Sequence, residues 1–93
     1  MANVIVTIKI MPESPDVNLD QIREHAEQKI DAFVGSNKQK QHEIKPVAFG
    51  LKSLEIHFMM DEAKGSPESL ADEISGFDGV QSAEITNVNR PMG

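Results

Sequence analysis

The sequence predicts an α+β fold in which four strands and two helices follow one another in the order βαββαβ. Apolar residues recur at every second position over residues 4–10 and 54–60, which is the period of strands buried on one face. Over residues 19–33 the apolar spacing changes to three or four, which is the period of an amphipathic helix. These three patterns define the framework, and the weaker elements are inferred around them.

The first strand and the first helix have clear boundaries. The strand is expected at about residues 2–11, because Pro12 and the polar residues after it interrupt the alternation. Asn18 is a good N-cap, and Gln21 stands three positions later, as in a capping box. One apolar stripe follows, made of Leu19, Ile22, Ala26, Ile30 and Phe33. Gly35 is expected to end the helix.

The remaining elements have weaker signals. Residues 38–46 are mostly polar and predict a weak or edge strand. The second helix is expected to begin at residues 66–68, where a serine cap, a first-turn proline and an acid that complements the helix dipole occur in succession. Gly76 or Gly79 is expected to end it. The last strand, at residues 80–88, has apolar positions that do not alternate strictly, so a β-bulge is expected there.

This order of elements is that of the ferredoxin-like sandwich, with two helices on one face of a four-stranded antiparallel sheet. We expect residues 1–93 to form one such domain, because the chain is too short for a second core. The fold occurs in RNA-binding, metal-handling, regulatory and enzymatic proteins, so it does not identify a function.

Composition excludes several classes of function. The chain lacks cysteine, which rules out disulfides, thiolate zinc sites and cysteine nucleophiles and favours a cytoplasmic location. The apolar run at residues 4–11 is too short and too interrupted for a signal peptide or a membrane span. The net charge of −6 argues against general binding to nucleic acid, because neutralising phosphates supplies most of that affinity.

Positive charge is concentrated in residues 36–52. The segment has a local net charge of +3, because one glutamate, Glu43, stands among Lys38, Lys40, Lys45 and Lys52. A basic edge on an acidic body could steer a partner of mixed charge or reach one phosphate group. The alternative is that these lysines only keep a sheet edge soluble.

The sequence shows no active-site motif, and we expect no metal or cofactor site. His25, His42 and His57 have none of the spacings that bind zinc, and no phosphate-binding loop or nucleophile motif occurs. A base-stacking surface for RNA is not expected either. Aromatic residues are absent from the expected outward positions of the first and third strands, which are Asn3, Ile5, Thr7, Lys9, Ser53, Glu55, His57 and Met59. Ile5 and Met59 make this face partly apolar, which suits either a partner or a covering terminal segment.

Two residues stand out as candidate contacts with a partner. Phe49 lies between Pro46 and Gly50, which favour a bend, so its ring is expected on a turn. It is either an anchor for a partner, which we favour, or a cap on the edge of the core. Arg90 follows the last strand, where a guanidinium could bind a phosphate or a carboxylate or remain solvated.

Three segments resemble the archaeal translation elongation factor 1-beta family: IMPESPDV at 10–17, PVAFGL at 46–51 and ITNV at 85–88. The likeness covers about residues 4–90. It implies the ferredoxin-like fold and guanine-nucleotide exchange activity on the GTPase elongation factor 1-alpha. The expected partner is this GTPase, in both its nucleotide-bound and its nucleotide-free form. Neither covalent chemistry nor a direct contact with nucleic acid or membrane is expected. The alternative is a protein- or RNA-binding module of the same fold without exchange activity.

The resemblance also implies roles for single residues. Phe49 matches a ring that docks into a pocket on the GTPase, and Arg90 falls where eukaryotic relatives carry a lysine that enters the magnesium and phosphate region. Gly50, Lys45 and Lys52 flank the ring and are assigned to the same contact. The tail departs from the archaeal pattern, since relatives often show paired basic residues there. We expect Phe49 and Arg90 to stand at the same end of the domain, so that one partner meets both.

Overall fold

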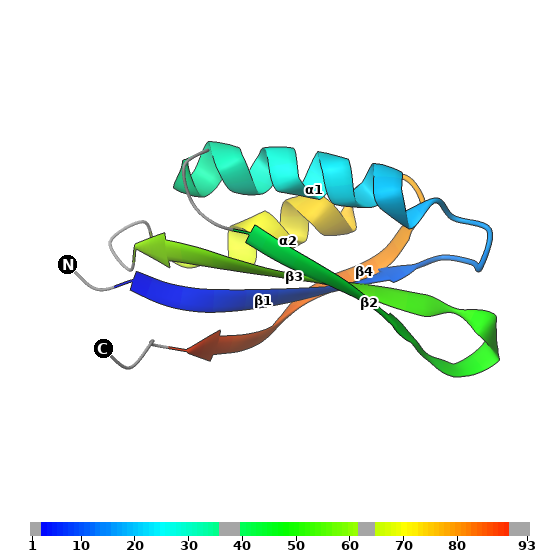
Figure 1. Ribbon diagram of the computed structural model, residues 1–93. Coiled ribbons are helices and arrows are strands. Elements are labelled where there is room, and N and C mark those ends of the chain that lie inside the picture. The colour runs from blue at the N-terminus through cyan, green and yellow to red at the C-terminus, as the bar shows by residue number, and fades with distance from the viewer. Residues whose placement is uncertain (1–2, 36–39, 62–64, 90–93) are drawn as a thin grey trace.

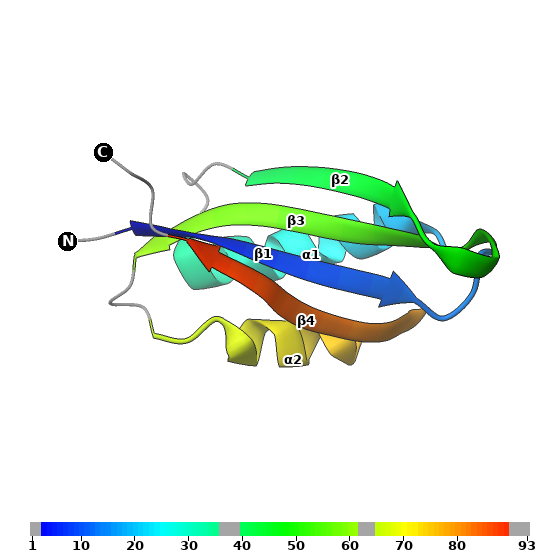
Figure 2. The same cartoon turned by 90° about the horizontal axis from the view of Figure 1, so that it is seen from below.

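The computed structural model describes residues 3–35, 40–61 and 65–89, with only the backbone described at Phe49. Four antiparallel strands form one sheet in the order β2-β3-β1-β4, and two helices cover one of its faces (Figures 1 and 2). This is the ferredoxin-like arrangement expected from the sequence. The elements are β1 (Asn3–Pro12), α1 (Leu19–Val34), β2 (Lys40–Pro46), η1 (Ala48–Gly50), β3 (Lys52–Asp61), α2 (Glu68–Ser75) and β4 (Val80–Asn89).

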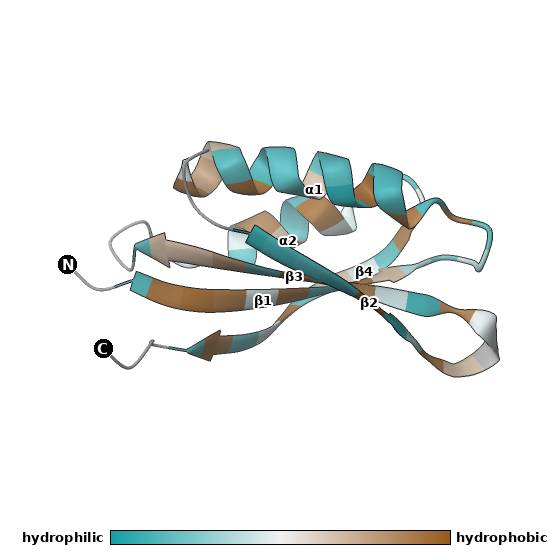
Figure 3. Ribbon diagram, viewed as in Figure 1, coloured by the Kyte–Doolittle hydropathy of each residue, from teal (hydrophilic) through white to brown (hydrophobic). Residues whose placement is uncertain are grey.

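The core lies between the two central strands and the helices. The side chains that the alternating pattern placed inward are at most 6% exposed, and they are Val4, Val6, Ile8, Ile10, Leu54, Ile56, Phe58 and Met60. Ile22, Ala26, Ile30 and Val34 of α1 and Leu70 and Ile74 of α2 pack on them. Figure 3 shows the apolar character of β1 against the polar character of β2 at the sheet edge. Burial of this single apolar layer stabilises the packing of the two helices on the sheet.

Both helices begin close to the predicted positions. The Asn18 carboxamide oxygen accepts hydrogen bonds from the backbone N–H groups of Asp20 and Gln21, so the predicted cap of α1 is confirmed. At α2 the Ser66 hydroxyl accepts from the Glu68 N–H, while Pro67 takes the cap position rather than the first helical one. Neither helix in the described part of the chain has the length and apolar character needed to cross a membrane.

Small irregularities occur in the outer strands and at the end of β1. β2 is an edge strand as predicted, although residues 38 and 39 lie outside the described residues. β1 extends to Pro12, one residue beyond the predicted end at residue 11. Because Pro12 is the last residue of the strand, it disrupts little of the hydrogen-bond ladder. The pairing of β4 with β1 shifts register twice, which leaves Thr86 and Gln81 as extra residues and confirms the expected bulge.

The strand directions define two ends of the sheet. We call the first the hairpin end, because η1 joins β2 to β3 there (Figure 1). β1 also finishes at this end, and β4 begins opposite Pro12. At the other, the tail end, Asn89 pairs with Ile5 and Asn3 pairs with Asp61. The seven residue steps from Ile5 to Pro12 separate the two ends by about 25 Å.

Candidate partner-binding site

The turn predicted around Phe49 is present and is held by its own backbone. The Val47 N–H donates to the Leu51 carbonyl oxygen at 2.8 Å, and the Leu51 N–H donates to the Ala48 carbonyl oxygen at 3.2 Å. Gly50 has a φ of +76°, a conformation that residues with a Cβ rarely adopt. Ala48 and Gly50 are exposed, so η1 is a tight surface turn at the hairpin end. Whether the Phe49 ring is an anchor or an edge cap stays a prediction, because its side chain lies outside the described residues.

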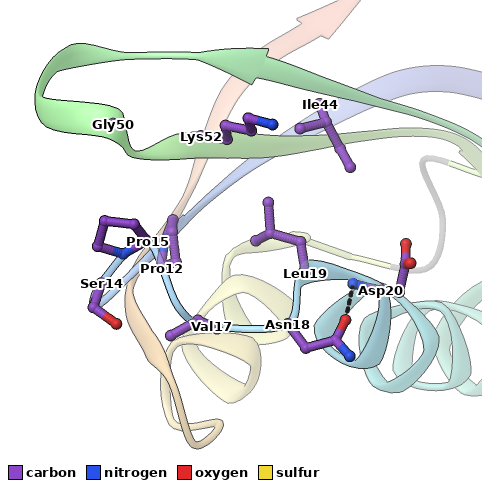
Figure 4. Close-up of a pocket in the computed structure, with 10 residues that line it drawn as sticks. All are labelled: Pro12, Ser14, Pro15, Val17, Asn18, Leu19, Asp20, Ile44, Gly50 and Lys52. Atoms are coloured by element: carbon purple, nitrogen blue, oxygen red, sulfur yellow. Dashed lines mark hydrogen bonds between the residues drawn. The ribbon is translucent and has the colours of Figure 1, made fainter.

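A cleft of about 410 Å³ lies beside this turn, on the helix-bearing side of the sheet (Figure 4). The hairpin forms one wall, and the loop between β1 and α1 forms the other. The lining residues are Pro12, Ser14, Pro15, Val17, Asn18, Leu19, Asp20, Ile44, Gly50 and Lys52. Two of the three segments that resemble the elongation factor family, 10–17 and 46–51, therefore lie on opposite walls of one cleft. The cleft itself was not predicted, because it depends on how far the hairpin extends past the sheet.

The cleft combines apolar and charged groups on exposed surface. Ile44 is 43% exposed although it belongs to the apolar face of the sheet, because β2 lies at the edge. Leu19 lies across the cleft from it (Figure 4). Lys52 is exposed on the hairpin wall, and among the described residues it forms no ion pair. A cleft that mixes apolar side chains with polar and charged ones beside a projecting turn suits contact with another protein.

The other lysines of the basic segment are already paired within the chain. Lys45 points to the open face of the sheet, where its ammonium lies 3.4 Å from a Glu55 carboxylate oxygen and 3.5 Å from one of Glu43. Attraction to Glu55, and then to Glu43, raises the pKa of Lys45. Lys40 forms an ion pair with Asp31 of α1. Carboxylates therefore pair with the described lysines of this segment other than Lys52, which weakens the expected basic edge.

Arg90 lies outside the described residues, but the strand that leads to it is described. β3 and β4 are both antiparallel to β1, so both run away from the hairpin. Asn89, the last described residue, pairs with Ile5 at the tail end, about 25 Å from the hairpin end. The described neighbours of Phe49 and Arg90 therefore lie at opposite ends of the sheet, whereas the expected position of Arg90 itself lies outside the described residues.

Three ionisable side chains lie together on the open face, and the sequence analysis missed them as a group. Glu43 pairs directly with Glu55 across the β2-β3 ladder, and His57 follows two residues later on the same face. One candidate ligand atom from each lies within 4.8 Å of the others. The sequence indicates this group only if the pairing of the two strands is worked out from the turn. Positions 43 and 55 are equidistant from Phe49, the centre of the turn, so they face each other in the hairpin.

The ferredoxin-like fold by itself does not identify a function, but the sequence of the chain identifies its family. Residues 5–90 match the family model described as the EF-1 guanine nucleotide exchange domain, and the chain belongs to this family. Relatives named elongation factor 1-beta agree with that assignment. The protein from Methanothermobacter thermautotrophicus is 38% identical over 92 residues, which cover 99% of this chain and all of the relative. That from Nanoarchaeum equitans is 36% identical over 83 residues, covering 89% of this chain and 99% of the relative.

A comparison of solved structures supports the fold alone. The de novo designed protein Foldit4 superposes with a TM-score of 0.64 at 14% identity, and the match covers 98% of each chain. An architecture that a designed sequence also adopts is set by packing and topology rather than by function. The assignment to an exchange family therefore rests on the sequence relatives.

Proposed function

We propose that the whole chain acts as a single cytoplasmic domain that promotes GDP release and GTP reloading on elongation factor 1-alpha. The observation that carries the proposal is the cleft beside η1, whose two walls are lined by segments with the family resemblance. Family membership supports the exchange activity itself. The cleft beside η1 is the surface of this chain that is proposed to bind the GTPase.

The hairpin end supplies the docking contact. Phe49 on its turn is the proposed anchor, since a buried aromatic ring commonly dominates an interface. Gly50 permits the backbone conformation that presents it, and Lys52 on the cleft wall supplies a charged contact at the rim. Lys45 is retained as a contact residue, but its ammonium reaches a partner only by leaving Glu43 and Glu55.

The tail end supplies the contact that weakens nucleotide binding. Arg90 is proposed to place its cation among the magnesium and phosphate contacts that hold GDP. Because β4 runs away from the hairpin, this contact and the docking contact involve separate parts of the GTPase. The exchange domain then spans its partner along the length of the sheet.

Exchange follows from linkage and involves no covalent step. A protein that binds the nucleotide-free GTPase more tightly than the nucleotide-bound form weakens nucleotide binding by the same factor. Contacts at the hairpin end that are equal in both forms contribute affinity without promoting release. Contacts at the tail end that exist only without Mg²⁺ and GDP provide the difference. The two ends therefore have separable effects.

The test is release of a fluorescent GDP analogue from the cognate elongation factor 1-alpha, with and without this protein. We expect Phe49→Ala to weaken affinity for the GTPase. At a saturating concentration of the variant, the rate of GDP release should still be close to that with the wild type. Gln28→Ala, on the exposed face of α1, is the surface control. Removal of residues 90–93 should slow release at saturation more than it weakens binding.

Release unaffected by the wild-type protein would favour the binding module without exchange activity, and a filter-binding assay with RNA would then test its ligand. An unchanged affinity and rate in Phe49→Ala would contradict the docking role alone. Equal losses in binding and release after tail removal would contradict the proposed displacement of Mg²⁺.

A further inference from the structure

The open face of the sheet, opposite the helices, carries a compact set of metal-ligand side chains. Glu43 and Glu55 are direct cross-strand partners, and His57 lies two residues beyond Glu55. The three residues offer two carboxylate oxygens and one imidazole nitrogen within 4.8 Å of one another. None of these residues belongs to the cleft or to the η1 turn, so the proposed docking contact does not use them.

Two carboxylates placed directly opposite each other on neighbouring strands repel, and the pair needs a cation nearby. The chain provides one, because the Lys45 ammonium lies within 3.5 Å of both carboxylates. Glu55 is only 17% exposed in its side chain, so water screens it less than it screens a free surface acid. Lys45 therefore marks a position at which the protein attracts positive charge.

The imidazole is held independently of this ion cluster. Thr7 of β1 is 6% exposed, and its Oγ1 lies 2.8 Å from His57 Nδ1. When Nδ1–H donates to this hydroxyl, the lone pair on Nε2 is free for a ligand, and the contact fixes the ring orientation. Metal-binding histidines commonly have such a partner on their second nitrogen. A hollow of about 150 Å³ adjoins the ring, between Ile5, Gln41 and Met59.

We propose that Glu43, Glu55 and His57 bind one divalent transition-metal ion, with Zn²⁺ as the representative ion and water at the remaining positions. Two carboxylate oxygens and one imidazole nitrogen are a donor set that Zn²⁺ accepts, and three protein ligands leave a fourth position open. Ligand atoms around tetrahedral zinc lie about 3–4 Å apart, so the side chains need to move slightly closer, which the exposed Glu43 side chain permits.

Lys45 is an internal competitor for this site. Its ammonium occupies the space between the carboxylates, so metal binding requires that it swing into solvent, where its flexible stem allows it to go. The site is therefore weakened in the wild-type chain, and removing the ammonium strengthens it. A bound ion links β2 to β3 across the strand pair that carries η1, so it also raises the stability of the folded chain.

The experiment is calorimetric titration of the purified chain with Zn²⁺, with Co²⁺ absorption reporting the ligand geometry. We expect Glu43→Gln and His57→Gln each to weaken Zn²⁺ binding at least tenfold, and Lys45→Met to strengthen it several-fold. Thr7→Val tests positioning of the ring and should weaken binding by about tenfold. The matched control is His42→Gln, an exposed histidine on the opposite face of β2, which should bind as the wild type does.

A thermal melt adds a readout that needs no GTPase. Zn²⁺ should raise the melting temperature of the wild-type and His42→Gln proteins and leave that of His57→Gln unchanged. Absence of Zn²⁺ binding to both the wild type and Lys45→Met would overturn the proposal. Equal weakening by His42→Gln and His57→Gln would also overturn it, because binding would then reflect scattered surface histidines. Circular dichroism of each variant ensures that loss of binding is not loss of fold.

Discussion

Glu43 of β2 lies directly opposite Glu55 of β3, and the Lys45 ammonium lies between their carboxylates. Glu43 and Lys45 belong to the basic segment at residues 36–52 and Glu55 follows it, yet the fold makes Lys45 the counter-ion of both acids. A lysine satisfied within its own chain contributes less to attracting a partner than its charge in the sequence indicates. Lys52, on the other face of the same hairpin, is the better candidate for a contact across an interface.

The ion triad predicts a pH dependence of stability in the alkaline range. The carboxylates, Glu55 first, raise the pKa of Lys45 above its ordinary value of 10.5. A raised pKa in the folded state means that the stabilisation is complete below 10.5 and is lost as the pH rises through the folded-state pKa. The free energy of unfolding of the wild type should therefore exceed that of Lys45→Met at neutral pH by a small amount that narrows above pH 10.5.

Urea denaturation at a series of pH values measures this difference, with a chelator present to exclude metal binding. Lys45→Arg is the control, because guanidinium stays protonated throughout the range and its advantage over Lys45→Met should not narrow. High salt should reduce the extra free energy of unfolding that the wild type and Lys45→Arg have over Lys45→Met, since the cation at position 45 is exposed and salt screens its ion pairs. A difference between wild type and Lys45→Met that is constant across the alkaline range would show that the pairs contribute nothing.

The η1 turn depends on the backbone freedom of Gly50. Its φ is +76°, and a Cβ added there would meet no atom within 4 Å, so any cost of Gly50→Ala comes from the backbone and not from crowding. We expect this substitution to lower the free energy of unfolding by about 1–2 kcal/mol. Gly76→Ala is the control, since Gly76 has an ordinary φ of −87° and its added Cβ would lie 3.5 Å from the backbone oxygen of Glu73.

Urea unfolding of both variants measures the comparison, and Gly76→Ala should stay within about 0.5 kcal/mol of the wild type. Equal stability of the two variants would mean that the turn relaxes to another conformation without cost. In that case Gly50→Ala should still alter affinity for the GTPase, because the turn that presents Phe49 would have changed shape.

Local patterns were enough to predict most of the fold. The alternation in β1 and β3 follows directly from burial on one face, and the Asn18 cap follows from local hydrogen bonding, so neither depends on distant residues. The irregular apolar spacing of β4 predicted a bulge, because an extra residue must break the two-residue period. The spacing did not predict that β4 has two register shifts, because the shifts are defined by its pairing with β1.

The site was harder to predict because its parts meet through tertiary structure. The turn at Phe49 could be located from Pro46 and Gly50, but the cleft beside it requires the loop before α1 to approach the hairpin. The ion partners of Lys45 depend on the β2-β3 register. The position of Asn89 at the tail end depends on following strand directions through the whole topology, and the expected position of Arg90 lies outside the described residues.

Burial rather than residue type should decide the effect of shortening an isoleucine. Ile56 of β3 is fully buried, whereas Ile44 of the neighbouring edge strand is 43% exposed on the same side of the sheet. Ile56→Val should lower the free energy of unfolding by about 0.5–1.5 kcal/mol, because one methylene leaves a packed core. Ile44→Val removes the same group from a cleft wall and should cost less than about 0.5 kcal/mol.

Chemical denaturation of the two variants, measured side by side, checks this prediction. An equal cost would indicate that Ile44 is packed more firmly than its exposure suggests. Because Ile44 lines the cleft, its shortening should affect GTPase affinity while leaving stability nearly unchanged, and Ile56→Val should show the reverse. That crossed pattern distinguishes a binding surface from a structural one.

The separation between the hairpin end and the tail end predicts how losses at the two contacts combine. Phe49→Ala changes the hairpin end, whereas removal of residues 90–93 shortens the chain after Asn89, which lies about 25 Å away at the tail end. Their effects on affinity for nucleotide-free elongation factor 1-alpha should therefore add within about 0.5 kcal/mol in a double-mutant cycle. If both contacts instead met one pocket of the GTPase, loss of the first would already reduce the second, and the double variant would bind better than the sum predicts. A coupling clearly larger than that limit, measured by titration of the four proteins, would contradict the two-ended arrangement.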